Sequence, residues 1–414
     1  MHSSLGSAGR SWPAVYFAVA ALLVPMTSRA QNPNCADVDL PNKIYGVGGS
    51  AARPLIAAFG RALAALPGSE RISVVWHDPG ACHAMNVLVG QDDGSGERTP
   101  QHIAGTGARY WLPDGTEQRC DFAADTVLAD FGYMAALPAD CQGYEDVDLA
   151  ALELGSFIGP VSGWSIITHP DSSQSAISAE ALYLAYAFGD ESQAAPWTHT
   201  AYLYARNHTS AALLAWVAAT GLPSTSFLGE DVGDNITMVS RVASAAEPSA
   251  ALGFVSSEVA DANRATVKTL AFQAKDQICG FLPDSTSTSF DKKNIRDGHY
   301  WNWASHIFYA PVNGAGVPTN ASVAHFFDAI TGRAAPTAEV PNLDIIIGEG
   351  TIPECAMRVS RAGSYTALAS FAPDEPCGCY YDYVADGASS CTECETTDDC
   401  AGEQVCRHGF CEEW

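Results

Sequence analysis

The sequence predicts an α/β fold with mixed, mostly parallel sheets, followed by a small disulfide-rich C-terminal tail. Short apolar stretches typical of strands alternate with helical patterns over most of the chain. Hydrophobic residues make up 47% of the 414 residues and charged residues only 16%, which is enough apolar material for a large packed core. Seven of the 13 cysteines lie in the last 38 residues, among mostly polar neighbours, so disulfides rather than a core must hold this tail.

The first 30 residues have the features of a secretory signal peptide. Arg10 supplies a positive charge, Trp12 to Met26 are largely apolar, and Ser28-Arg29-Ala30 resembles a cleavage site. The apolar run is too short for a membrane anchor and ends in Pro25 and polar residues. We therefore expect an exported protein, periplasmic or secreted, that is soluble after cleavage near Ala30.

The net charge of -26 argues against nucleic acid and anionic membranes as partners. A small anion remains open as a ligand, because backbone N–H groups can bind it locally within an acidic surface. No GxSxG, HExxH or paired Asp-rich metal motif is present. For His77, His83, Asp297 and His299 a structural role is favoured over catalysis. We expect a protein that is not an enzyme, with no cofactor and no metal.

The N-terminal third begins with a strand that ends in a glycine-rich turn, Asn42 to Ser50 (NKIYGVGGS). A helix is predicted to follow over Ala51 to Leu66, with Pro54 in its first turn. Further predicted elements are a strand at Ile72 to Trp76, a hairpin at Gly107 to Phe122 that turns at Pro113-Asp114-Gly115, and a strand at Leu128 to Met134.

The following part of the chain continues the alternation of strands and helices. Predicted strands are Val161 to Thr168, Gly253 to Val255 and Phe308 to Val312. Predicted helices are Ala179 to Phe188 after a Ser178 cap, Ser257 to Ala265, and Ala321 to Thr331 after Thr319 or Asn320.

The stretch Tyr202 to Pro223 has the pattern of an anion-binding helix start. A short strand leads to Arg206, Thr209 and Ser210 follow, and a helix is predicted over Ala211 to Thr220 with Gly221 at its end. A helix N-terminus offers free N–H groups and a partial positive charge, and an arginine can add a bidentate contact to an oxyanion. The simpler alternative is that Thr209 or Ser210 only caps the helix and Arg206 is a surface charge.

Several motifs, in this order along the chain, together resemble the periplasmic phosphate-binding proteins of ABC transporters. The first is the glycine-rich turn Gly46-Val47-Gly48-Gly49-Ser50. Asp130 to Ala135 resembles the family's Asp-Phe-Gly-x-Ser-Asp, Arg206 to Ala212 its Arg-x-x-x-Ser-Gly-Thr, and Ala251 to Phe254 its Ala-Ile-Gly-Tyr. The resemblance spans roughly Lys43 to Arg333.

The resemblance implies the two-lobed type II periplasmic-binding-protein fold. Lobe 1 would comprise residues 36–158 and 298–372, lobe 2 residues 159–297, and the tail residues 373–414. It also implies a monomer that captures phosphate or a related oxyanion between the lobes and delivers it to an ABC transporter permease. The implied ligand-binding residues are Gly49, Ser50, Ala51, Arg206, Thr209 and Ser210.

Four positions depart from the family pattern: Met134, Ala135 and Ala212 lack the expected polar side chains, and Ala211 stands where the family has glycine. The loop serine of the family is also missing, at Ala81 or Cys82. Asp130 or Asp78 could replace the carboxylate lost at Ala135. Each missing hydrogen bond weakens binding by roughly 1–3 kcal/mol. The alternative is therefore a scaffold that has lost phosphate binding and acts as a secreted or surface interaction protein.

The cysteines are interpreted as disulfides because the chain carries an export signal. Cys120 is predicted to pair with Cys141 across the Leu128 to Met134 strand, and Cys279 with Cys355 between the lobes. Cys35 and Cys82 stay open, as does the pairing within the tail. The CxxC at Cys391 and Cys394 could also bind zinc, but export favours a disulfide knot. The odd count leaves one cysteine over, and the tail's partner is unknown.

Overall fold

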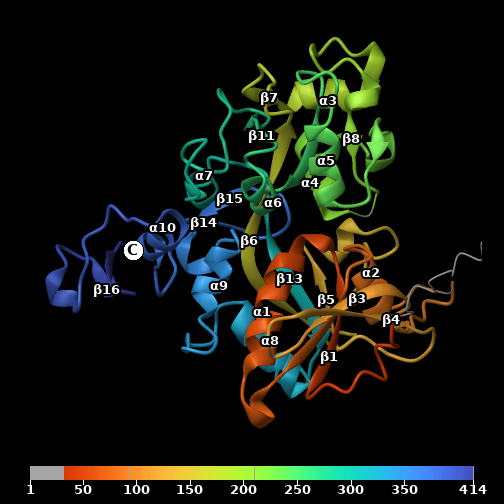
Figure 1. Cartoon of the computed structure of the whole chain (residues 1–414), viewed down its shortest axis with the longest axis vertical. Helices are drawn as coiled ribbons and strands as arrows, with labels where there is room; N and C mark the ends of the chain where they lie inside the picture. The colour runs from red at the N-terminus through yellow and green to blue at the C-terminus, as the bar shows by residue number, and fades with distance from the viewer. Residues whose placement is uncertain (1–31, 93, 209, 414) are drawn as a thin grey trace, which may run out of the picture. The chain divides into compact units, whose positions relative to one another are not determined.

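The structure, a computed structural model, describes residues 32–92, 94–208 and 210–413, and its core is a nine-stranded mixed sheet. The signal peptide predicted at residues 1–30 lies outside the described residues. The strand order is β10-β6-β13-β5-β1-β2-β3-β4, and β11 also pairs with β6 (Figure 1). The bounds are β1 Lys43–Gly48, β2 Ser73–His77, β3 Gly105–Trp111, β4 Glu117–Phe122, β5 Phe131–Met134, β6 Leu154–Thr168, β10 Gly253–Ser256, β11 Lys268–Thr269 and β13 Trp303–Pro311.

The long strand β6 connects two lobes. Its first half pairs with β13, and its second half pairs with β10 and β11. Lobe 1 is therefore built on β1–β5 with the paired parts of β6 and β13, and lobe 2 on the end of β6 with the strands between β6 and β13. The register of β6 and β13 shifts between Ser305 and Ile307, so that Gly159 and Pro160 lie opposite His306 alone. The predicted two-lobed α/β architecture is confirmed.

Antiparallel pairing is more common in the sheets than predicted. Parallel ladders join β1 to β2 and β5, and also two small pairs in lobe 2, β7 (Ala176–Ser178) with β12 (Ala271–Gln273) and β8 (Tyr204–Ala205) with β9 (Glu230–Asp231). The ladders of β3, β4, β6, β10 and β13 are antiparallel. The parallel centre of lobe 1 still places the carboxyl ends of β1, β2 and β5 at one edge.

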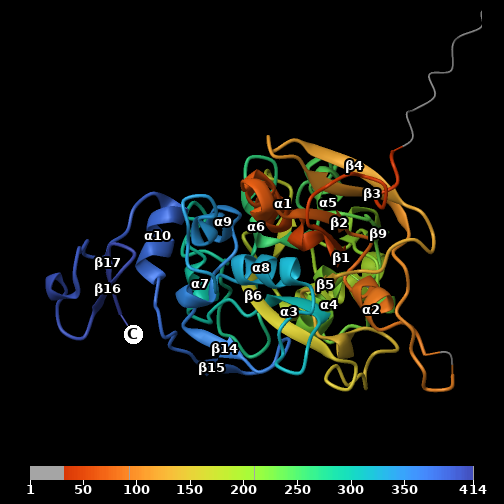
Figure 2. The ribbon, with the colours of Figure 1, turned by 90° about the horizontal axis from the view of Figure 1, so that it is seen from below.

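Helices cover both faces of the lobe 1 sheet. Phe131 of β5 packs against Phe326 and Phe327 of α8, with ring centroids 5.1 and 5.8 Å apart. The adjacent Gly132 faces Leu88 of α2. Because neighbouring side chains of a strand point to opposite faces, α8 and α2 lie on opposite sides of the sheet (Figure 2). The helices of this lobe are α1 Arg53–Ala65, α2 His83–Leu88, α8 Ala321–Ile330 and α9 Asn342–Gly348.

Lobe 2 has an aromatic core between helices and strands. Trp216 of α4 packs against Phe254 of β10 and Phe272 of β12, with ring centroids 6.2 and 5.0 Å apart. Tyr186 of α3 contacts the same Phe254. All four side chains are buried, so this cluster fixes α4 on the sheet. The helices are α3 Ala179–Phe188, α4 Ala211–Thr220, α5 Asn235–Ala243, α6 Ser257–Ala262 and α7 Lys293–Arg296.

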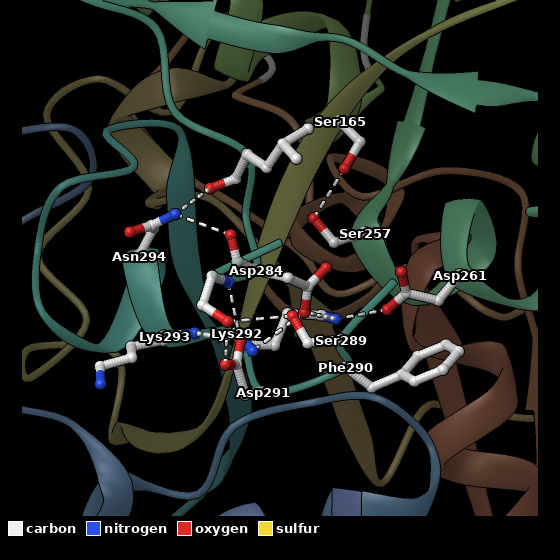
Figure 3. A network of polar contacts seen from close by, with 12 residues as sticks. Ser165, Ser257, Asp261, Asp284, Ser289, Phe290, Asp291, Lys292, Lys293 and Asn294 are labelled. Carbon is white, nitrogen blue, oxygen red and sulfur yellow. Dashed lines mark hydrogen bonds and ion pairs between the residues drawn. The ribbon is translucent and has the colours of Figure 1, made fainter. Parts of the chain in front are cut away.

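The loop before α7 is anchored by a buried ionic network (Figure 3). The ammonium of Lys292, which is 1% exposed, contacts Asp261 of α6 and lies 2.8 Å from Asp284 Oδ1. Arg264 bonds to the same two carboxylates, at 2.6 and 2.9 Å. Burial alone would lower the pKa of Lys292, but the two carboxylates outweigh it and raise that pKa. Two cations thus balance two anions, and the network holds the loop on α6.

The tail begins with a helix that packs against the lobes. Tyr381 of α10 (Gly378–Asp386) is fully buried, and Arg296 stacks on its ring at 4.7 Å. Arg296 also donates to Gly378 O at 3.1 Å and pairs with Asp382. The remaining strands are β14 Val359–Arg361 and β15 Leu368–Ser370 before the tail, and β16 Val405–Arg407 and β17 Phe410–Glu412 within it.

Six disulfides are formed, and both predicted pairings were wrong. Cys120 pairs with Cys35 rather than Cys141, because the chain around Asn34 hydrogen-bonds along β4 at Asp121. Cys141 pairs with Cys82 at the start of α2.

The predicted pair of Cys279 and Cys355 fails because the tail returns to the body. Cys355 pairs with Cys377, while Cys279 is free and exposed. The tail's other disulfides are Cys379–Cys391, Cys394–Cys406 and Cys400–Cys411. The CxxC cysteines thus belong to two different disulfides, as the disulfide interpretation predicts.

Most of the predicted helices are confirmed close to their predicted bounds. α4 covers Ala211–Thr220, and Gly221 ends it in the left-handed conformation at φ 75°. The Ser178 hydroxyl caps α3, and the Asn320 side chain caps α8. The first helix starts with a 3-10 turn at Ser50–Ala52 before α1, and α6 stops at Ala262. Among the described residues, none of the helices has the length and apolar character needed to cross a bilayer.

Candidate functional site

A small cavity lies where loops of the two lobes meet, and we call it the interlobe cavity. It encloses about 70 Å³. A water molecule needs roughly 10–15 Å³ on this measure, so the cavity has room for a few waters or one small ion. Its walls come from the β1–α1 turn, the β2–α2 turn, the β8–α4 loop and the start of α5.

Five of the six predicted ligand residues line the interlobe cavity. Gly49, Ser50 and Ala51 come from lobe 1, and Arg206 and Ser210 come from lobe 2. Thr209 lies outside the described residues. The structure therefore brings together two segments that the sequence places far apart.

Two helix starts at the cavity have no side-chain cap. Ser210 occupies the N-cap position of α4, yet its hydroxyl makes no capping hydrogen bond. Neither Gly49 nor Ala52 provides a side-chain cap for the 3-10 turn and α1. By contrast, Asp234 caps α5 through Thr237 N. The first N–H groups of α4 and of the 3-10 turn before α1, with the positive ends of the helix dipoles, are left available for an anion. The first two positions of α1 itself offer none, because Arg53 N–H bonds to Ser50 O and Pro54 has no N–H.

Arg206 is held rigidly at the cavity wall. Its side chain is 7% exposed, and it donates to Asn235 Oδ1 at 2.6 Å and to Gly233 O at 3.0 Å. Among the described residues its Nε has no hydrogen-bond partner. Burial lowers the pKa of Arg206, while Asp234 and Asp231 act to raise it. The surface-charge alternative for Arg206 is therefore wrong.

A second arginine at the cavity, Arg53, was missed by the sequence analysis. It lies in the first turn of α1, where the helix dipole disfavours a cation. This unfavourable position of a charge is the feature of the sequence that could have marked Arg53 as a site residue. Arg53 contacts Asp78, whose other oxygen accepts from Arg109 at 3.1 Å. The charge of Arg53 lowers the pKa of Arg206, so the two cations face the same space.

The two acidic candidates for the missing family carboxylate differ in position. Asp78 follows β2 directly and lines the interlobe cavity. Asp130 does not; it accepts from Tyr45 N at 2.8 Å and from Asn320 Nδ2 at 3.0 Å, which ties β1 to the α8 cap. Only Asp78 can therefore face a ligand.

The apolar substitutions fall into two groups. Ala81, Ala211 and Ala212 line the cavity with methyl groups. Met134 and Ala135 are buried, at 0% and 1% exposure, and belong to the core rather than the cavity wall. The cavity thus has fewer side-chain donors than the family pattern implies.

A buried polar cluster lies next to the cavity floor. Tyr133 and Trp164 line the cavity, and the Tyr133 ring lies tilted against the His306 ring, with the centroids 5.1 Å apart. Behind them Glu258 accepts from Ser162 Oγ at 2.7 Å. Burial raises the pKa of Glu258 to about 7, while the neighbouring hydroxyls of Ser256 and Ser162 act to lower it. No periodic pattern in the sequence marks this cluster.

No family model and no curated protein matches this chain. Among solved structures, it is similar to a phosphate ABC transporter substrate-binding protein from Clostridium perfringens with bound phosphate, with 12% identity over 75% of this chain and 99% of that chain and a TM-score of 0.47. An ABC-type phosphate transport receptor from Vibrio cholerae has 14% identity over 75% and 99%, with a TM-score of 0.44. A phosphate-binding protein from Stenotrophomonas maltophilia has 13% identity over 76% and 91%, with a TM-score of 0.44. At these low sequence identities and TM-scores, the function has to be inferred from the chain's own residues.

Proposed function

We propose that this protein binds a small oxyanion, with inorganic phosphate as the first candidate, in the interlobe cavity. The observation that carries the proposal is the presence of two arginines from opposite lobes, Arg53 and Arg206, on one cavity of about 70 Å³. They repel each other when the cavity holds no anion, and an anion between them would relieve that repulsion.

The neighbouring groups suit a tetrahedral oxyanion. Ser50 and Ser210 offer hydroxyls, and the uncapped starts of α4 and of the 3-10 turn before α1 offer backbone N–H groups. Asp78 would accept a hydrogen bond from the O–H of a protonated anion such as hydrogen phosphate, whereas fully deprotonated sulfate has no O–H to donate. The interlobe cavity would then bind phosphate more tightly than sulfate because of Asp78.

The proposed biological role is capture outside the cytoplasm. The signal-peptide pattern of residues 1–30 and the six disulfides support export to an oxidising compartment. In this role a monomer with lobe 1 at 36–158 and 298–372 and lobe 2 at 159–297 would deliver the anion to an ABC transporter permease. The protein would act by binding and not by catalysis.

A second candidate function is an interaction protein on a scaffold that no longer binds phosphate. The methyl groups of Ala81 and Ala212 in the cavity wall favour it, since they stand where the family pattern implies hydroxyl groups. The tail at 373–414 would then contact the partner.

Thermal unfolding of the mature protein with phosphate, with sulfate and with neither anion tests the proposal. A ligand at a hundredfold excess over its Kd stabilises the folded state by about 2.7 kcal/mol. We expect a rise in Tm with phosphate that Arg206→Ala abolishes. Because Arg206 also makes buried hydrogen bonds, Ser210→Ala is the cleaner variant, since its hydroxyl caps nothing.

The matched control is Ser178→Ala, which removes a real helix cap far from the cavity. It should lower the Tm but keep the phosphate-dependent rise. Absence of any rise with millimolar phosphate would reject the proposal in favour of the interaction protein.

A further inference from the structure

A second cavity, separate from the interlobe cavity, lies beside the strands that join the lobes. It encloses about 230 Å³ and has no lining residue in common with the interlobe cavity. Its walls come from β6, from β13 and from the segment 354–371, and they are mostly apolar or aromatic. The lining residues include Ile158, Val161, Trp303, Met357, Arg361 and Tyr365. We call it the Arg361 cavity.

Among the residues that the structure describes, Arg361 forms no ion pair. Its guanidinium lies over the rings of Trp301, Trp303 and Tyr365, at 5.0, 4.3 and 5.9 Å from their centroids. It donates to the carbonyls of Trp303 at 2.9 Å and Trp301 at 2.5 Å, and its Nε has no partner among the described residues. Glu354 lines the same cavity but is exposed and forms no ion pair with Arg361 within the described chain.

The electrostatic state of Arg361 matches that of Arg206. Burial lowers the pKa of Arg361 to about 10, while Tyr365 acts to raise it. A guanidinium that is taken out of water without a carboxylate partner carries a desolvation cost, which an anion would offset. Burial also lowers the pKa of Arg206, although Asp234 and Asp231 lie near it, and each arginine lines a cavity.

We propose that the Arg361 cavity binds an organic anion, a carboxylate attached to a small apolar or aromatic body. The carboxylate would accept from the free N–H groups of Arg361, whose planar fork suits two oxygens. The body would pack on Trp303 and Tyr365 and on the apolar wall at Val161 and Met357. Inorganic phosphate offers no apolar surface for these walls, so the two cavities take different ligands.

The mouth of the cavity supports an apolar ligand. Ile158 lines the cavity and is 50% exposed, an unusual position for a large aliphatic side chain in the middle of a strand. A bound apolar group would cover it, at roughly 25 cal/mol for each Å² of apolar surface removed from water.

Phenylacetate and its neutral isostere phenylacetamide test the proposal on the mature protein, with binding followed by isothermal calorimetry. The acid should bind saturably in the millimolar range or better, and the amide should bind at least tenfold more weakly, since a charge-assisted hydrogen bond is lost. Equal binding of acid and amide, or no saturable binding of the acid, would overturn the proposal.

A variant at the cavity mouth gives a second test that does not disturb the arginine's own hydrogen bonds. Ile158→Asp places a competing carboxylate in the cavity at an already exposed position, so the affinity for phenylacetate should fall at least tenfold. Ile158→Leu is the matched control and should bind as the wild type does. Unchanged binding in Ile158→Asp would reject the assignment.

The two cavities can be separated experimentally. Ser210→Ala should leave phenylacetate binding unchanged, and Ile158→Asp should leave the phosphate-dependent rise in Tm unchanged. Failure of one ligand to bind therefore does not bear on the other.

Discussion

Arg53 and Arg206 line the same cavity from opposite lobes, and the positive charge of Arg53 lowers the pKa of Arg206. The two side chains have different supports. Arg206 is fixed by Asn235 and Gly233, while Arg53 shares Asp78 with Arg109. Arg53 can therefore exchange its carboxylate for a ligand while Arg109 continues to neutralise Asp78.

Replacement of this lobe 1 arginine should weaken anion binding with little effect on stability. Arg53→Gln removes one charge-assisted contact, and phosphate affinity should fall by about ten- to a hundredfold, or 1.5–3 kcal/mol. Since the Arg53 side chain is 30% exposed, its ion pair contributes little to the free energy of unfolding. Calorimetric titration with phosphate measures the effect. Arg61→Gln, at an exposed position of the same helix, is the control and should bind normally; equal affinity of both variants would contradict a role for Arg53.

Stability should decrease between about pH 4.5 and about pH 7 because of Glu258. In the unfolded chain this carboxyl has its ordinary pKa of 4.5, whereas in the folded protein burial raises the pKa to about 7. Within that window the folded state binds more protons than the unfolded state, so the free energy of unfolding falls as pH rises. The fully developed penalty above pH 7 is on the order of 3 kcal/mol. Asp261 adds to it by repulsion.

Urea unfolding of wild type and Glu258→Gln at pH 5 and pH 8 measures this dependence. The variant should lose most of the difference between the two pH values. Glu247→Gln, at a half-exposed carboxylate, should keep it. A wild-type protein that is equally stable at both pH values would contradict the expected titration.

The tail should unfold together with the lobes and not separately. Tyr381→Ala removes a fully buried ring from the contact with Arg296 and should cost about 3–5 kcal/mol of unfolding free energy. Tyr383→Ala on the same helix changes a side chain that is 48% exposed and should cost less than about 0.5 kcal/mol. Tryptophan fluorescence reports mainly on the lobes, because they hold every tryptophan that follows residue 30 except Trp414. A normal lobe transition in Tyr381→Ala would show that the tail is an independent unit.

The disulfide between Cys82 and Cys141 should contribute strongly to stability, unlike the free Cys279. The bond closes a separation of 59 residues, for which chain entropy gives about 4 kcal/mol. The double variant Cys82→Ala with Cys141→Ala should lose roughly this amount of unfolding free energy in urea unfolding, whereas Cys279→Ser should match the wild type.

Mass spectrometry of non-reduced peptides should link Cys35 to Cys120. A peptide that joins Cys120 to Cys141 would contradict the structure.

Local patterns in the sequence predicted the elements well because caps and periodicity are local properties. The helix Ala211–Thr220 ends at Gly221 as expected, and the hairpin of β3 and β4 turns at Pro113 to Gly115 as expected. The half of the site carried by the β1 turn and the Arg206 loop was also found. These segments needed only the preference of anions for helix starts.

Features that depend on pairing between distant parts of the chain could not be predicted from local patterns. The antiparallel ladder of β6 and β13 joins residues far apart in the sequence, so the alternation of strands and helices suggested too much parallel pairing. The pairing of Cys35 with Cys120 depends on where the N-terminal segment lies along β4. Arg53 and Asp78 form part of the site only because β1 and β2 are neighbours in the sheet.

β6 belongs to the sheets of both lobes without a break, and β13 lies along it. Rotation of one lobe against the other therefore has to twist this pair of strands. The twist should concentrate at the register shift at His306, because Gly159 and Pro160 have no ladder partners there. Motion between the lobes should accordingly be angular, about one axis, with the bending confined to a few residues. Such a connection resists sliding of one lobe along the other. The two walls of the interlobe cavity would therefore separate and return to the same relative position.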